Sequence, residues 1–162
     1  MALIDFTSYE AVRAALGVSV DEISDVTLAL DLYDFNLQVE LDSINTTLSG
    51  IYLAAKANPT PTDQEKRLVR STSLFATYCV AKHLTTSLPL FSPKDISDSK
   101  ASFARYTSDP YKEVIAGVLS LYQKFIEQVK SDFASLNQTT VTSTRRTFML
   151  VASPSSDPVT GT

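Results

Sequence analysis

Cys79 and His83 are the two side chains of this chain whose types and spacing could support catalysis. They are its only cysteine and only histidine, and they lie four residues apart, so a helix would place them on one face. A thiolate beside an imidazole is the nucleophile–base pair of cysteine hydrolases. We favour another interpretation, in which Cys79 belongs to the core and His83 lies near a helix end, where partial positive charge is favourable. One cysteine and one histidine also cannot supply the four ligands of a zinc site. We therefore expect no catalytic residues, no metal and no cofactor.

The charged residues indicate neither a calcium site nor a nucleic-acid-binding surface. Seven acids lack the spacing of a calcium loop and fit a solvated face or a negative lining that lets DNA slide: Asp21, Glu22, Asp25, Asp31, Asp34, Glu40 and Asp42. The net charge is −4, and the four glycines form no phosphate-binding loop. Among scattered arginines, Arg105 is the one we expect to pair with another subunit.

Composition favours one soluble domain. The 162 residues are 44% hydrophobic, enough for a real core. The start, MALIDFTSYE, lacks the features of a secretory signal, and no apolar run approaches the roughly 20 residues that span a bilayer. A single cysteine excludes an intrachain disulfide and fits a reducing compartment. We expect synthesis in a cytoplasm and no membrane association.

Capping signals mark the first helices. Thr7 with Glu10 forms a capping-box pair, and Gly17 suits the end of the helix that this pair opens. A second pair, Ser19 with Glu22, predicts a short helical turn. A longer element capped by residue 24 or 25 is then expected to run to about residue 45.

This longer element fits either secondary structure. Residues 35–42 alternate between apolar and polar side chains, as in a strand. On a helix the same region has two apolar stripes, one of Leu30, Tyr33, Leu37, Leu41, Ile44 and Leu48, the other of Leu28, Leu32, Phe35 and Val39. We favour the helix, whose second stripe must be buried against another molecule. Leu28, Leu32, Phe35 and Val39 are therefore the predicted subunit interface.

Two further helices are predicted in the second half. After a break at NTTLSG and a short helix over residues 51–57, Thr62 and Glu65 form a third capping box that opens a helix ending before Pro89. Residues 88–108 are polar and read as a long surface loop. Asp109 as N-cap with Pro110 at the first position predicts a final helix to about residue 136.

The C-terminal segment differs from the helical body. Residues 141–151 are rich in β-branched and apolar side chains, and a Pro/Ser/Thr stretch follows. A lone β-prone segment must pair its backbone groups with a neighbouring molecule. We expect a docking arm whose contacts come from Arg145, Arg146, Phe148, Leu150, Val151, Pro154 and Pro158. The predicted fold is thus mainly α, a helical bundle over residues 1–138 with a long surface loop and an extended, β-prone arm over 139–162.

Three segments, together with the long last helix and the terminal arm, form a distinctive order along the chain: YEAVRAALGVSVDEISD, TDQEKRLVRSTSLFATYCVAKHL and DISDSKASFARYTSDP. They resemble the head–tail connector (adaptor, or head-completion) proteins of tailed double-stranded DNA bacteriophages. The resemblance covers most of the chain but contains no short diagnostic motif. It implies a homo-oligomeric ring, commonly of twelve subunits, in the neck of the virion. Such a ring docks beneath the portal protein, reaches it with the C-terminal arm, and presents a surface to the next neck or tail protein.

The resemblance further implies that DNA passes through the ring without sequence-specific binding, and that the protein is made in the bacterial cytoplasm and is not an enzyme. A tail-completion or tail-terminator protein is the close alternative. A helical DNA-binding regulator is a second alternative, disfavoured because its recognition helix would carry acids instead of groove-reading side chains. A small helical enzyme is a third alternative, disfavoured because the sequence contains no recognisable set of catalytic residues.

Overall fold

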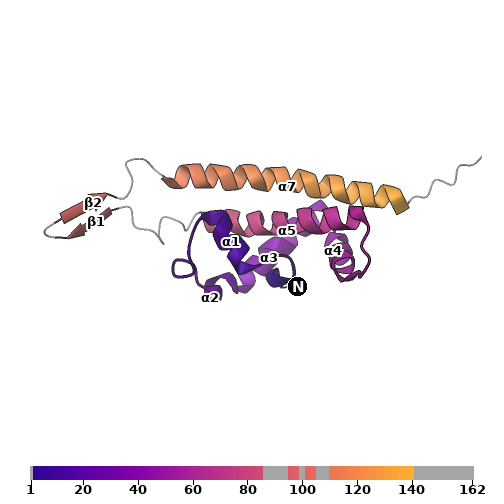
Figure 1. Ribbon diagram of the computed structural model, residues 1–162, viewed down its shortest axis with the longest axis horizontal. Helices are drawn as coiled ribbons and strands as arrows, with labels where there is room; N and C mark the ends of the chain where they lie inside the picture. Colours follow the sequence, from indigo (N-terminus) through magenta and orange to yellow (C-terminus); the bar gives the residue numbers. More distant parts are fainter. Residues whose placement is uncertain (1, 86–94, 99–100, 105–109, 141–162) are drawn as a thin grey trace, which may run out of the picture.

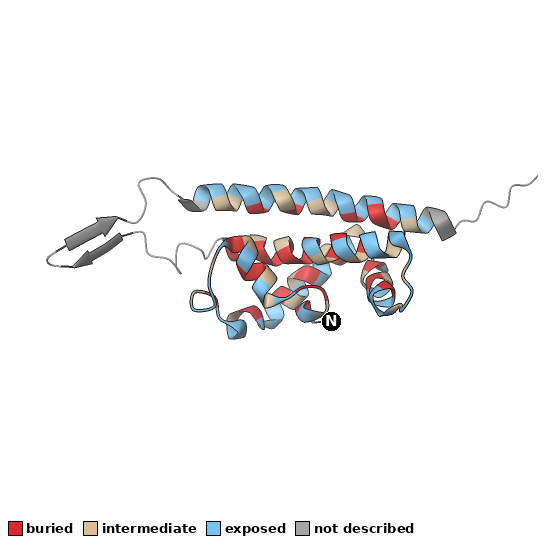
Figure 2. Ribbon diagram, in the orientation of Figure 1, coloured by how far each residue is buried: buried red, intermediate tan, exposed pale blue. Residues whose placement is uncertain are grey.

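The computed structural model describes residues 2–85, 95–98, 101–104 and 110–140, and is mainly α-helical (Figure 1). Its two long helices, α5 (Asp63–Leu84) and α7 (Pro110–Thr140), run antiparallel and side by side. The N-terminal helices contact the side of α5 opposite α7. Because α5 is covered on two sides, it contributes more buried residues than any other described helix (Figure 2).

The N-terminal part begins with a 3₁₀ turn, η1 (Leu3–Asp5), followed by α1 (Tyr9–Leu16). The predicted Thr7–Glu10 capping box is wrong by one residue, because Ser8 is the N-cap and its hydroxyl accepts from the Ala11 backbone N–H at 3.2 Å. The Thr7 hydroxyl instead hydrogen-bonds that of Thr77 at 2.6 Å, joining the start of α1 to α5. The predicted end is confirmed: Gly17 has a φ of 70°, a left-handed conformation that favours glycine.

Between α1 and α3 the chain makes turns and one short helix. The Ser19 backbone N–H donates to Glu22 at 2.7 Å, but this segment forms a turn and not the predicted helical turn. Ser24 then caps α2 (Asp25–Leu28), as expected. The buried Arg13 of α1 holds α2 in place through a 2.6 Å ion pair with Asp25.

The predicted continuous element from residue 24 to 45 is wrong, because Leu30 is extended (φ −66°, ψ 133°) and separates α2 from α3 (Asp31–Ile44). A continuous helix would place Leu28 and Leu32 on one face, four residues apart. The break instead allows Leu28, at 1% exposed, to enter the core while Leu32 stays at the surface. The choice of helix over strand for residues 35–42 is confirmed.

The remaining helices follow the predicted order. α4 (Leu48–Ala57) starts three residues earlier than expected, since the break is confined to Asn45–Thr47. The Thr62–Glu65 capping box is confirmed: the Thr62 hydroxyl accepts from the Glu65 N–H, and the Glu65 carboxylate accepts from the Thr62 N–H. α7 starts at Pro110 as predicted, with Asp109 outside the described residues, and continues to Thr140, two residues into the predicted arm.

A short β-hairpin lies within the segment predicted as a loop. β1 (Asp95–Asp98) and β2 (Ala101–Ala104) pair antiparallel, with Ile96 opposite Phe103. Each strand is only four residues long, too short for its alternation to stand out in the sequence. The rest of this predicted loop, Arg105 included, lies outside the described residues, as does the predicted arm after Thr140.

Candidate functional site

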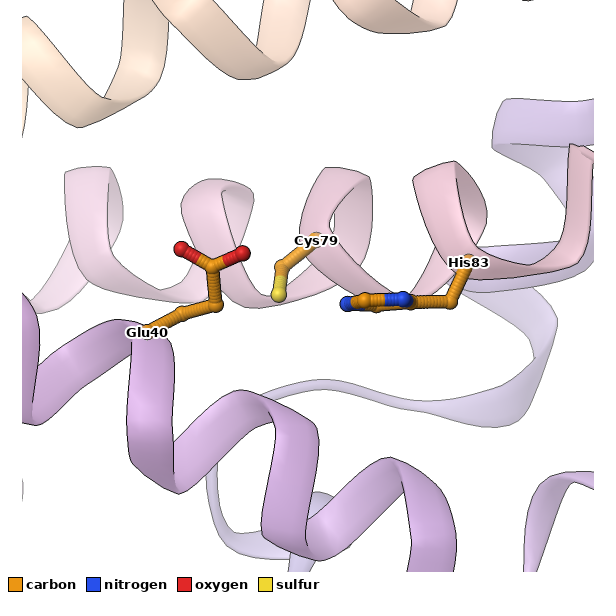
Figure 3. A group of neighbouring side chains, drawn as sticks. All are labelled: Glu40, Cys79 and His83. Carbon is orange, nitrogen blue, oxygen red and sulfur yellow. The ribbon is translucent and has the colours of Figure 1, made fainter.

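Glu40 of α3 and Cys79 and His83 of α5 form a cluster of potential metal ligands (Figure 3). Their ligand atoms all lie within 4.8 Å of one another. The i, i+4 spacing of Cys79 and His83 on one face of a helix was predictable. The contribution of Glu40 was not, because it depends on how α3 crosses α5.

Glu40 is already engaged by two donors from other helices. Its carboxylate accepts from the Lys82 ammonium at 2.6 Å and from the Tyr122 hydroxyl of α7 at 2.7 Å. The same ammonium lies 4.1 Å from the centre of the Tyr122 ring. Burial alone would raise the pKa of Glu40, but the hydrogen bonds from Lys82 and Tyr122 outweigh it and the pKa is lowered. The carboxylate is therefore a charged anchor joining α3, α5 and α7.

The thiol and imidazole are poorly suited to nucleophilic chemistry. Burial, reinforced by the charge of Glu40, raises the pKa of Cys79 to about 12, so the reactive thiolate is suppressed. Burial, with the Lys82 charge, lowers the pKa of His83. The placement of Cys79 in the core and of His83 in the last turn of α5 is confirmed. The donor set fits a metal poorly, since binding would have to ionise this thiol and displace the Lys82 ammonium.

A second candidate is the outward side of α3. Leu32, Phe35 and Val39 are 59%, 65% and 68% exposed, and they follow one another at helical spacing. On the inward side of the same helix, Tyr33, Leu37 and Leu41 are buried. We call Leu32, Phe35 and Val39 the α3 stripe. Three of the four predicted α3-region interface residues are thus at the surface.

The fourth, Leu28, was assigned wrongly: it is 1% exposed and belongs to the core, because the chain bends after α2. The other predicted site residues lie outside the described part of the chain, namely Arg105 and the arm residues Arg145, Arg146, Phe148, Leu150, Val151, Pro154 and Pro158.

A third candidate is an open groove of about 890 Å³ between η1, α4 and α5. Its apolar lining comes from Ile4, Phe6, Tyr52, Ala55, Pro61, Val69 and Leu74, and its cations are Lys56, Lys66 and Arg70. Lys56 donates to the Asp5 carbonyl and Lys66 pairs with Asp63 at 3.3 Å, whereas no carboxylate of the described residues pairs with Arg70. Sequence reasoning missed this groove, because its walls come from segments far apart in the chain.

Comparison of the chain with protein-family models, with curated proteins and with solved structures gives no match. None of the helices in the described residues has both the length and the apolar character needed to cross a membrane.

Proposed function

We propose that this chain is a structural virion protein that forms a ring at the head–tail junction of a tailed phage. The ring docks under the portal protein, extends the DNA channel, and offers an attachment surface to the next neck or tail protein. The chain acts by assembly and not by catalysis. It carries no sequence-specific contacts to the DNA that passes through.

The observation that carries this proposal is the α3 stripe. Its three large apolar side chains are more than half exposed on a helix whose other face is fully used in the core. Contiguous exposed apolar surface of this kind marks an interaction site. A subunit of a ring needs such a surface, because it contacts a neighbour on each side.

The character of the same surface argues against a DNA-binding regulator. The stripe carries apolar side chains, and Asp31 and Asp42 lie one turn from Phe35 and Val39 on the same helix. A helix that reads the major groove needs Arg, Lys, Asn or Gln at such positions. Carboxylates beside DNA repel its phosphates, which suits a channel or a protein contact better than a recognition surface.

The direct test is the location of the chain in purified virions. Gold-labelled antibody, or density in electron micrographs, should place multiple copies as a ring between the DNA-filled head and the tail. Particles made without the chain should accumulate as filled heads without attached tails. Presence at the distal end of the tail tube would favour the tail-terminator alternative, and absence from virions would refute the proposal.

A second test addresses the predicted arm, which lies outside the described residues. Deleting residues 141–162 should leave the helical body folded, since α7 is complete at Thr140. The same deletion should prevent attachment to filled heads, because the arm is the proposed contact with the portal. Strong amide protection across residues 148–151 in a proven monomer would contradict a docking arm, because it would show that this segment already folds on its own domain.

A further inference from the structure

We propose that the α3 stripe of one copy docks into the cationic apolar groove of the next copy. The interface is head-to-tail: the stripe and the groove share no residues, so each copy has one of each to offer. An interface of this kind closes into a ring or continues as a filament. This inference names the partner of the surface on which the proposed function rests.

The two surfaces are complementary in charge. Asp31 precedes Phe35 by four residues and Asp42 follows Val39 by three, so an acid lies one turn from each end of the stripe. Both acids are exposed, and no cation of the described residues pairs with either. The groove has Lys66 and Arg70 along one side and Lys56 on the other. Lys66 is already paired with Asp63, so the cations that match the unpaired acids of the stripe are Arg70 and Lys56, neither of which pairs with a carboxylate of the described residues.

The two surfaces also match in apolar character and length. The stripe runs from Leu32 to Val39, which is seven residue steps of helix, or about 10 Å at the usual rise per residue. The α5 wall of the groove runs from Lys66 to Leu74 on one helix face, or about 12 Å. The volume of about 890 Å³ accommodates several large side chains. Phe35, the largest member of the stripe, is the expected anchor.

A symmetric contact of stripe against stripe is disfavoured by the same charges. With two antiparallel copies of α3 in contact, Asp31 of each copy would approach Asp42 of the other. Like charges placed together in an interface are repulsive, and no cation of α3 is available to offset them. The groove removes this repulsion because it supplies the opposite charge.

Mixing two blocked variants tests the head-to-tail arrangement. Phe35→Glu blocks the stripe and leaves the groove intact, whereas Leu74→Glu blocks the groove and leaves the stripe intact. Each variant alone should associate at least 100-fold more weakly than the unchanged protein. A mixture should form one-to-one dimers of near-normal affinity and nothing larger, as measured by sedimentation velocity. A mixture that stays monomeric, or unchanged protein that is monomeric at every concentration, overturns the inference.

Cysteine crosslinking gives a second test that does not depend on disruptive substitutions. Val39→Cys and Leu74→Cys place thiols on the stripe and in the groove, while the native Cys79 is fully buried with its pKa raised to about 12. Oxidation should join Val39→Cys to Leu74→Cys in a mixture at least tenfold more efficiently than it joins either to itself. Val26→Cys, at a site 78% exposed outside both surfaces, is the control. Self-crosslinking of Val39→Cys at equal yield would instead show a symmetric contact.

These outcomes are separable from those of the proposed function. Rings that assemble without the Val39–Leu74 crosslink would refute this interface and leave a virion role standing. A head-to-tail crosslink in a protein that is absent from virions would support this interface and refute the virion role.

Discussion

The inward and outward sides of α3 carry the same kinds of residue in two different environments. The inward side has Tyr33, Leu37 and Leu41, all buried. The outward side has Leu32, Phe35 and Val39, all more than half exposed. Full burial of one such side chain is worth about 1.5–3 kcal/mol, so the isolated subunit leaves several kcal/mol of apolar burial unused. In a domain with a typical stability of about 5–15 kcal/mol, that is a large reserve for association.

The difference shows that apolar character does not by itself reveal which side of a helix is the core. The inward side is fixed by what it meets: α4 and α5 pack against α3, and Glu40 ties it to α5 and α7. The outward side chains Leu32, Phe35 and Val39 are instead more than half exposed. We interpret the first side as the folding surface and the second as the assembly surface, and the following substitutions test that division.

The largest expected effect is on folding. Leu41 is fully buried, so Leu41→Ala should lower the free energy of unfolding by about 2–5 kcal/mol through lost burial and the cavity left behind. Val39→Ala, two residues away on the outward side, should change it by less than about 0.5 kcal/mol. Urea denaturation of the monomer measures both. Similar losses for the two variants would contradict the division.

The next effect is on assembly. Replacing Leu32 and Phe35 together with Glu should weaken self-association at least 100-fold, about 2.7 kcal/mol, because charges would have to be buried in the interface. The monomer should keep its helical circular dichroism and its urea midpoint. Replacing Val20 and Val26, which are also exposed but lie outside the stripe, with Glu is the matched control. Normal assembly of the Leu32/Phe35 variant, seen by sedimentation, would remove α3 from the interface.

Much of this division could be predicted from the sequence, because it depends on local spacing. The two stripes within residues 32–41, the Thr62–Glu65 box, the Gly17 end and the start of α7 at Pro110 all follow from helix geometry and capping chemistry. Leu30, which was predicted on the inward stripe, is instead 50% exposed, because the chain is extended there. The continuous helix over residues 24–45 was wrong because Ala29 and Leu30 carry no helix-breaking signal. The break there follows from tertiary packing, which buries Leu28.

The sites themselves were less predictable. Glu40 joins Cys79 only because two helices cross, and the groove draws on η1, α4 and α5 together. Neither arrangement leaves a pattern in the sequence, since Glu40 and Cys79 are 39 positions apart and η1 precedes α4 by more than 40 positions. The stripe was found because its members are close neighbours on one helix.

A third prediction concerns Glu40, the charged member of the inward side. Its side chain and that of Lys82 are only 23% and 24% exposed, so Lys82→Met should cost about 1.5–3 kcal/mol by removing a charged partner. Lys66→Met breaks the exposed pair with Asp63 and should cost less than about 0.5 kcal/mol. Urea denaturation at pH 7 checks both. Equal small losses would mean that the Glu40 anchor contributes little.

The pH dependence of stability gives an independent check on the same anchor. The pKa of Glu40 is lowered in the fold, so its contribution is present above the ordinary value of 4.5 and is lost as pH falls through the folded pKa. The pKa of Lys82 is raised, so its contribution is present below 10.5 and is lost as pH rises through the folded pKa. Burial, with the hydrogen bond to Glu40, raises the pKa of Tyr122 to about 12. The contribution of Tyr122 to stability is therefore also lost as pH rises, like that of Lys82. Lys82→Met should therefore flatten the acid limb of the profile, and an unchanged acid limb would assign that limb to other carboxylates.

The smallest effect concerns where α3 begins. The sign of the change in stability caused by Leu30→Ser distinguishes a helix that begins at Asp31 from one continuous helix over residues 24–45. Leu30 is the N-cap of α3, and its side chain makes no capping hydrogen bond. At the corresponding position of α2, the Thr27 N–H donates to both the carbonyl and the hydroxyl of Ser24. Leu30→Ser should reproduce that arrangement with the Tyr33 N–H and stabilise the monomer by about 0.5–1 kcal/mol.

If residues 24–45 formed one helix, the same substitution would fall in its interior and on its inward stripe. It would then destabilise the protein, because serine is a poorer helix former and buries less apolar surface. Leu30→Ala is the matched control, since it removes the same apolar side chain without adding a cap. A urea midpoint for Leu30→Ser above that of Leu30→Ala and of the unchanged protein fits a helix that begins at Asp31. A midpoint below both would restore the continuous helix and, with it, the placement of Leu28 beside Leu32 on the outward side.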